Sequence, residues 1–197
     1  APTAASVGGG SVRRSHLRLD GTAFSQLLLG AIAGGAGASA GVEGSTKLAR
    51  QTAAAAAQCG LRCVLVLGPK APAQLNGNLL IDRLTGTSIR WAGDRDRADV
   101  VQDVVNEERA AGRHPYVIPY GGSSTVGATG YVLAMEELTR QMLEMELTFD
   151  RIVFPTSSGG TQAGLVVGAE ANHYQGQVLG ISVDRPAAEM VPQVLEL

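Results

Sequence analysis

The chain has 197 residues, a length that suits one ordinary domain or two small ones. Its hydrophobic content of 45% and charged content of 17% predict a folded chain, and no apolar run reaches the roughly 18 residues that span a membrane. The net charge of −2 and the aromatic content of 4% argue against nucleic acid or a membrane surface as a partner.

The first 44 residues differ from the rest of the chain. They are rich in Gly, Ala and Ser and show little periodicity, so we expect an irregular segment there. From residue 45 onward, helical patterns alternate with short apolar runs, and glycines mark the turns. The expected helices cover residues 45–57, 78–84, 95–111 and 161–172, with a further helix after Ser124. The expected strands cover residues 62–67, 87–91, 116–118, 151–154 and 177–183.

This alternation of strands and helices predicts an α/β fold with a mainly parallel sheet. Ligands of such sheets bind at the carboxyl ends of the strands. Two loops rich in glycine and serine follow expected strands at that edge, one at residues 121–124 and the other at residues 156–164.

The loop at residues 156–164 has the composition of an anion-binding site. It reads Thr-Ser-Ser-Gly-Gly-Thr-Gln-Ala-Gly between an expected strand and an expected helix. A helix N-terminus offers unpaired N–H groups and the positive end of the helix dipole, and glycine lets an anion approach the backbone closely. The common nucleotide fingerprints, GxGxxG and GxxxxGKS or GxxxxGKT, are absent from this loop. We therefore predict that it binds a phosphorylated ligand, and the alternative is a turn that binds nothing.

Five segments between residue 41 and the last residue carry a resemblance to a known family. In this order and spacing they resemble the D-cysteine desulfhydrase and 1-aminocyclopropane-1-carboxylate deaminase family. Its members are pyridoxal-phosphate enzymes of the tryptophan-synthase-β fold type, called fold type II. The segments are residues 49–57, 77–86, 115–123, 159–164 and 178–183.

The resemblance implies pyridoxal phosphate as the cofactor and a small amino acid, D-cysteine or 1-aminocyclopropane-1-carboxylate, as the substrate. It also implies a smaller α/β domain at residues 45–118, part of a larger cofactor-binding domain at residues 119–197, and a homodimer. Family members begin earlier and continue further, so we expect this chain to be incomplete relative to them. The implied cofactor-binding residues are Ser158, Gly159, Gly160 and Thr161 at the phosphate, with Gly121 and Gly122 on the other side.

The chain departs from the family pattern at the residues that concern catalysis. The family binds its cofactor covalently through a lysine in a Gly-Gly-Asn-Lys motif, and the nearest match here has Ser11 at the lysine position. Serine cannot form that bond. The family's Ser-Asn pair before the first expected helix reads Thr46-Lys47 here. We expect Lys47 to replace the lost lysine and Thr46 to act near the substrate, whereas Lys70, the other lysine, is expected to be solvated.

The two cysteines fit neither a zinc site nor a disulfide framework. We interpret Cys59 and Cys63 as small buried apolar residues in a reducing, cytoplasmic compartment. No metal site is expected.

Two other functions compete with this interpretation. Residues 37–41 match GxSxG, the nucleophile elbow of α/β-hydrolases, so Ser39 with Asp150 and His173 would make a serine esterase. The other possibility is a catalytically inactive ligand-binding relative on the pyridoxal-phosphate scaffold. The absorption spectrum with added pyridoxal phosphate, and ester hydrolysis that depends on Ser39, distinguish the three.

Overall fold

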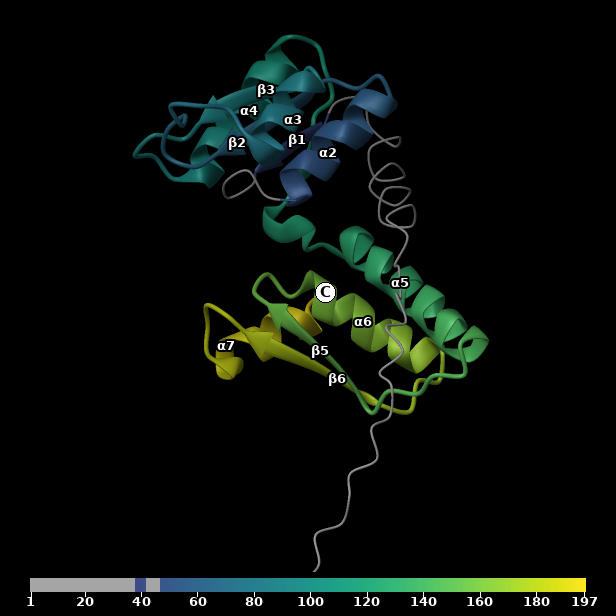
Figure 1. Ribbon diagram of the computed structural model, residues 1–197. Coiled ribbons are helices and arrows are strands. Elements are labelled where there is room, and N and C mark those ends of the chain that lie inside the picture. Colours follow the sequence, from purple (N-terminus) through teal and green to yellow (C-terminus); the bar gives the residue numbers. More distant parts are fainter. Residues whose placement is uncertain (1–37, 42–46) are drawn as a thin grey trace, which may run out of the picture.

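Every strand in the described part of the chain runs parallel to its neighbours, and the strands form two separate sheets (Figure 1). The structure, a computed structural model, describes residues 38–41 and 47–197. The first sheet has the order β3-β2-β1-β4, with β1 (Ala38–Gly41), β2 (Cys63–Leu67), β3 (Ser88–Trp91) and β4 (Tyr116–Ile118). The second sheet pairs β5 (Arg151–Thr156) with β6 (Gln177–Ser182).

Helices connect the strands and cover the sheets. They are α2 (Lys47–Gln58), α3 (Gly77–Leu84), α4 (Arg97–Ala110), the 3-10 turn η1 (Tyr120–Gly122), α5 (Thr125–Glu144), α6 (Gly160–Ala171) and α7 (Ala187–Leu195). Two begin at side-chain caps: Asp96 accepts a hydrogen bond from the Ala98 amide at 2.7 Å, and Ser124 accepts one from the Gly127 amide at 3.1 Å. Within the described ranges, no helix has the length and apolar character needed to cross a membrane.

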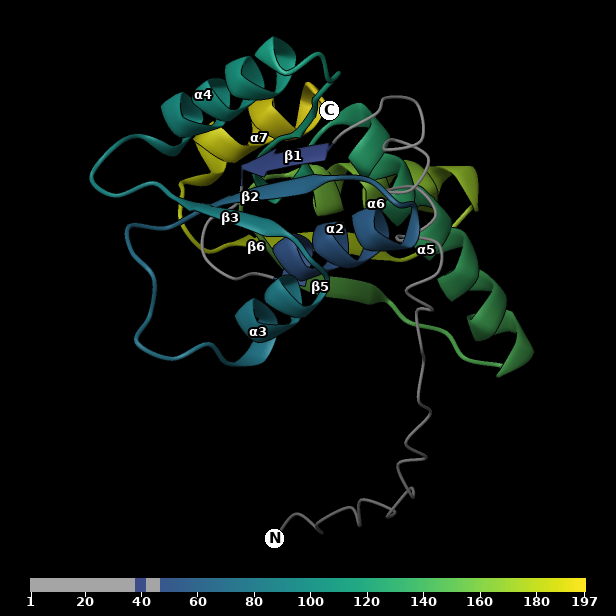
Figure 2. The same cartoon turned by 90° about the horizontal axis from the view of Figure 1, so that it is seen from above.

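The first sheet is packed on both faces. Its strand β2, near the middle of the sheet, is therefore buried along its whole length. Alternate residues of β2 point to opposite faces. One set packs against alanines of α2 and Leu79 of α3, and the other packs against Val100 and Val104 of α4. Figure 2 shows α4 on one side of the strands and α2 and α3 on the other. This three-layer packing explains why residues 63–67 are apolar at every position.

The second sheet has one packed face and one exposed face. The inward residues of β5 and β6 pack with Met135 of α5 and Leu165 of α6. The outward residues of the two strands are aligned by the register and exposed, among them Val153, Leu179 and Ile181. Parallel sheets are ordinarily covered on both faces, so this exposure is unusual.

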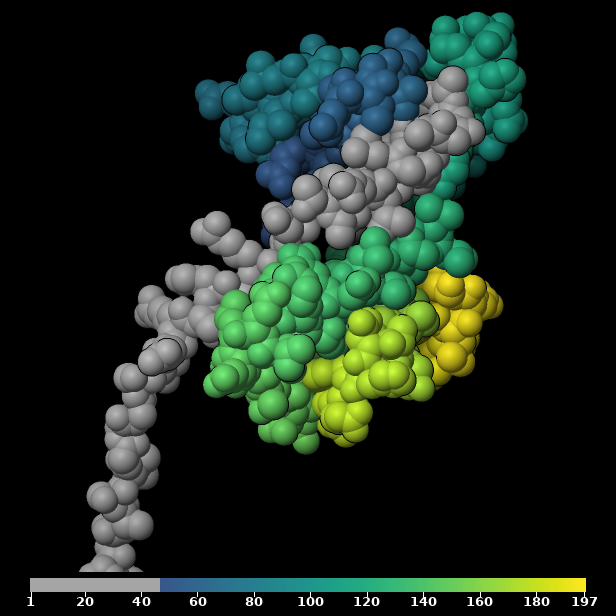
Figure 3. All heavy atoms as spheres, turned by 90° about the vertical axis from the view of Figure 1, so that its right-hand side faces the viewer, coloured from purple at the N-terminus to yellow at the C-terminus, as the bar shows by residue number. Residues whose placement is uncertain are grey.

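The turn η1 connects the two sheets and lies beside the start of α2. In Figure 3, residues 47–118 form the upper group of atoms and α5 with the second sheet forms the lower group. A Cβ on Gly122 of η1 would lie 3.4 Å from Leu48 Cδ1, so η1 touches the first turn of α2. The division of the chain into domains at residues 44 and 118 stays a prediction.

The expected parallel α/β fold is confirmed, and the expected elements have ends within about two residues of the observed ones. Two elements differ from expectation. The segment interpreted as irregular contributes β1, which pairs between β2 and β4, and α7 follows the last expected strand. Long-range pairing overrides the weak strand propensity of Gly, Ala and Ser in β1. The cysteine interpretation is half wrong, because Cys63 is buried but Cys59 is exposed at the end of α2.

Candidate functional site

The loop rich in serine and glycine lies between β5 and α6, as the sequence predicts. Gly159 has a left-handed backbone with a φ of 85° and directly precedes Gly160, the first residue of α6. Thr161 and Gln162 belong to the first turn of α6. The N–H groups of a first helical turn have no carbonyl acceptor within the helix. These N–H groups and the positive end of the helix dipole are the donors that an anion would meet.

Ser123, from the loop before α5, joins this helix terminus. Its hydroxyl oxygen accepts a hydrogen bond from the Gly160 amide at 3.1 Å and its proton is donated to Ser158 Oγ at 2.8 Å. The two glycine- and serine-rich loops therefore meet at one helix end. Ser123 Oγ also stands where an anion oxygen would be stabilised, since it accepts from an amide of the first helical turn.

Two glycines allow the loops to approach this closely. A Cβ on Gly121 would overlap Ser158 Oγ, and a Cβ on Gly160 would lie 2.7 Å from Ser123 Oγ. Gly121 also has a φ of 68°, which disfavours other residues. A side chain at either glycine would displace a serine from the hydrogen-bond network.

Lys47 is the first residue of α2, and its side chain is exposed. Its neighbour Leu48 contacts the η1 turn at Gly122, and the preceding residue of that turn, Gly121, contacts Ser158. The start of α2 thus lies beside the turn that closes over the loop. Thr46 and Ser11 lie outside the described residues.

Thr156 adds a buried hydroxyl at the beginning of the loop. It ends β5 with 4% exposure, and Thr156 Oγ1 has no hydrogen-bond partner among the described residues. A buried hydroxyl without a partner indicates a place for water or a ligand group.

The segment after β6 reaches the same loop. Ser157 Oγ donates a hydrogen bond to Asp184 Oδ2 at 2.6 Å, and Gln193 Nε2 donates one to the Ser158 carbonyl oxygen at 3.0 Å. The sequence indicated neither partner, and it did not single out Ser123 as a site residue. The only available signal was the position of Ser123 in the second glycine- and serine-rich loop.

The esterase interpretation is not supported by the backbone at Ser39. This residue is in the interior of β1, where it pairs with Val64 on one side and Val117 on the other. A nucleophile elbow requires a sharp strand-to-helix turn at the serine. Asp150 and His173 instead precede β5 and β6, at the amino ends of strands in the second sheet.

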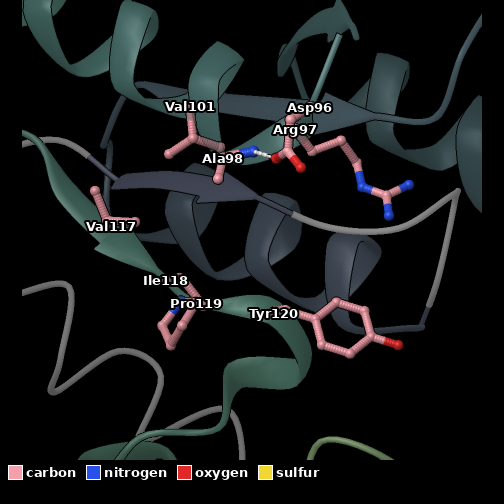
Figure 4. A pocket seen from close by; sticks show the side chains of 8 residues that line it. All are labelled: Asp96, Arg97, Ala98, Val101, Val117, Ile118, Pro119 and Tyr120. Atoms are coloured by element: carbon pink, nitrogen blue, oxygen red, sulfur yellow. Dashed lines mark hydrogen bonds between the residues drawn. The ribbon is translucent and has the colours of Figure 1, made fainter. Parts of the chain in front are cut away.

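A pocket of about 400 Å³ lies between α4 and β4 (Figure 4). Its walls are mostly apolar, with Val101 of α4 facing Val117 and Pro119, and Tyr120 at one end. It includes none of the residues predicted to bind the cofactor. Among the described residues there is also no group of three or more potential metal ligands.

The fold and this site define an α/β protein in which a glycine- and serine-rich helix N-terminus follows the carboxyl end of a parallel strand. Residues 23–195 match the family described as pyridoxal-phosphate dependent enzymes, and the chain belongs to that family. The resemblance found in the sequence motifs is thereby confirmed.

Several similar proteins are named D-cysteine desulfhydrase, and two of them illustrate the match. The protein of Klebsiella pneumoniae subsp. pneumoniae is 38% identical over 154 residues, which cover 75% of this chain and 47% of that protein. The protein of Salmonella choleraesuis is 40% identical with the same coverage. This chain therefore spans about half the length of the curated relatives that it matches.

Solved structures agree with the fold. An ACC deaminase homologue is 33% identical with a TM-score of 0.73, and the match covers 86% of this chain and 53% of that one. The diaminopropionate ammonia lyase of Escherichia coli is 19% identical with a TM-score of 0.61 over 90% of this chain and 53% of that one, which shows the fold alone. The expected fold-type-II architecture is confirmed.

Proposed function

We propose that this chain binds pyridoxal phosphate at the N-terminus of α6 and serves in the deamination or desulfhydration of a small amino acid. The substrate class is that of D-cysteine or 1-aminocyclopropane-1-carboxylate, and the setting is the cytoplasm. Family membership and the relatives' names support the chemistry. The observation that carries the proposal is the hydrogen-bonded contact of Ser123 with Ser158 and Gly160 at the start of a helix.

A phosphate monoester fits the residues at this helix end. Gly159 and Gly160 carry no side chain that could cover the N–H groups of the first helical turn, and Ser158 and Thr161 bring hydroxyl donors. Thr156 adds a buried hydroxyl without a partner among the described residues. Gly121 and Gly122 would line the site from the other side. A Cβ on Gly121 would overlap Ser158 Oγ, whereas one on Gly122 would only contact Leu48.

Pyridoxal phosphate supplies an electron sink for a substrate carbanion. The residues of the α6 loop bind its phosphate and fix its orientation. Lys47 is our candidate for the covalent attachment that the family makes through lysine, and Thr46 for a polar contact with the substrate. The contact of Leu48 with Gly122 supports this role, since it puts the start of α2 beside the η1 turn, which in turn touches the loop at Ser158.

Borohydride trapping tests the proposal. The protein is mixed with pyridoxal phosphate, its visible absorption is recorded, and the mixture is reduced and mapped by peptide mass. We expect a visible band that free cofactor lacks and a label on the peptide that contains Lys47. Lys47→Ala should remove the label, and Lys70→Ala, which changes the only other lysine, should keep it.

Three results would speak against parts of the proposal. A label that persists in Lys47→Ala excludes Lys47 as the attachment point. Binding of pyridoxal phosphate without any label favours the catalytically inactive relative. Absence of binding contradicts the cofactor proposal itself.

A further inference from the structure

The chain that follows β6 returns to the α6 loop and contacts it at successive residues. Asp184 accepts the Ser157 hydroxyl hydrogen bond at 2.6 Å, and Gln193 of α7 donates to the Ser158 carbonyl at 3.0 Å. Gln193 is itself held by Arg185, whose Nη1 donates to Gln193 Oε1 at 2.6 Å. The loop is therefore attached by side chains at residues 157 and 158, just before the helix begins.

Apolar side chains from the same segment pack on the turn itself. A Cβ on Gly159 would lie 3.3 Å from Val194 Cγ2 and 3.4 Å from Leu197 Cδ1. Figure 1 shows the C-terminal end of the described chain beside the start of α6. The left-handed turn at Gly159 thus has polar contacts before it and an apolar contact over it.

These contacts give the two adjacent serines, Ser157 and Ser158, different hydrogen-bond partners. The Ser157 hydroxyl donates its proton to the Asp184 carboxylate, so that proton is not available to a phosphate bound at the helix end. Ser158 uses its carbonyl oxygen for Gln193, and its side chain meets Ser123 on the side of the helix terminus. A loop that is already ordered loses less conformational entropy when it binds an anion.

We propose that Asp184 and Gln193 are positioning residues that hold residues 157–160 in the anion-binding conformation. The inference rests on the proposed function, because the anion in question is the phosphate of pyridoxal phosphate. In this proposal neither residue contacts the phosphate itself. Each acts through the loop, Asp184 through the Ser157 side chain and Gln193 through the Ser158 backbone.

The test compares ligands with and without phosphate. Dissociation constants are measured for pyridoxal phosphate, for pyridoxal and for inorganic phosphate. Gln193→Ala and Asp184→Ala should each weaken both phosphate-bearing ligands by roughly 3- to 10-fold, the value of one hydrogen bond, and leave pyridoxal unchanged. Asp184→Asn keeps an acceptor for Ser157 and should bind like the unaltered protein. Glu196→Gln changes an exposed residue at the end of α7, the helix that contains Gln193, and is the matched control.

A second measurement needs no ligand. Hydrogen exchange of the peptide covering residues 157–162 should be faster in Gln193→Ala than in the unaltered protein, while the melting temperature stays the same. Unchanged exchange, or an equal loss of pyridoxal and phosphate binding, overturns the inference. If the unaltered protein binds no phosphate-bearing ligand, the proposed function fails, whereas the exchange result still decides whether these residues hold the loop.

Discussion

Asp82 is a fully buried carboxylate on α3, far in the sequence from the predicted site. Neither of its carboxylate oxygens has a hydrogen-bond partner among the described residues. Burial raises the pKa of Asp82 to about 6, and the positive charge of Arg50 partly opposes this shift. A charged group in such a place costs stability because it has lost its hydration.

The resulting pH dependence has a definite sign. The pKa of Asp82 in the folded state lies above the unfolded value of about 3.9. Its contribution to stability is therefore fully present below about pH 4 and is lost as the pH rises through about 6. Asp82→Asn should raise the free energy of unfolding by on the order of 2 kcal/mol at pH 8 and change it little at pH 4.

Urea denaturation of Asp82→Asn at the two pH values checks this expectation. Asp94→Asn, a change in an exposed turn, serves as the control. The same effect at both pH values, or lower stability at pH 8, would contradict a raised pKa for Asp82.

At the scale of the elements, α5 and α6 approach each other through glycines. A Cβ on Gly164 would overlap the Ala128 carbonyl oxygen, and a Cβ on Gly168 would lie 2.6 Å from Met135 Cβ. Glycine has a low helix propensity, so helix formation does not explain why it recurs in α6. The close contact with α5 does.

Gly164→Ala should therefore destabilise the protein although alanine is the better helix former. We expect a loss of about 1–3 kcal/mol in the free energy of unfolding, the usual cost of overpacking. Val166→Ala changes an exposed position of the same helix, and its effect should be smaller. Chemical denaturation measures both, and a more stable Gly164→Ala variant would show that the helices separate without cost.

At the scale of the whole molecule, the second sheet leaves an apolar face in solvent. Val153 and Leu179 are paired neighbours on β5 and β6, with exposed fractions of 59% and 44%. An exposed apolar sheet face is an association surface. The chain should therefore self-associate through it.

Replacing both residues, Val153→Lys with Leu179→Lys, should weaken that association at least about tenfold, because two charges would have to be desolvated at the contact. Gln102→Lys adds a charge at an exposed polar position of α4, away from this face, as a control. Sedimentation velocity over a range of concentrations gives the result. Association unaffected by the double change would place the contact elsewhere.

Local signals were sufficient for much of the fold. The apolar run of β2 and the glycines that end helices depend on neighbouring residues, and the sequence predicted those elements. The helix α7 was missed because Pro192 lies inside it, and proline within a segment argues against a helix. The strand β1 was missed because its composition favours no structure until its neighbours pair with it.

The sequence by itself determined the family, the order of elements and the glycine- and serine-rich loop before α6, since motifs and periodicity are local properties of the chain. Only the tertiary structure decided what meets that loop. Ser123 reaches Gly160 across 37 residues, and Asp184 reaches Ser157 across 27. The burial of Asp82 and the placement of Ser39 within a strand also depend on packing between distant segments. Such contacts follow from how sheets and helices assemble, which residue spacing does not encode.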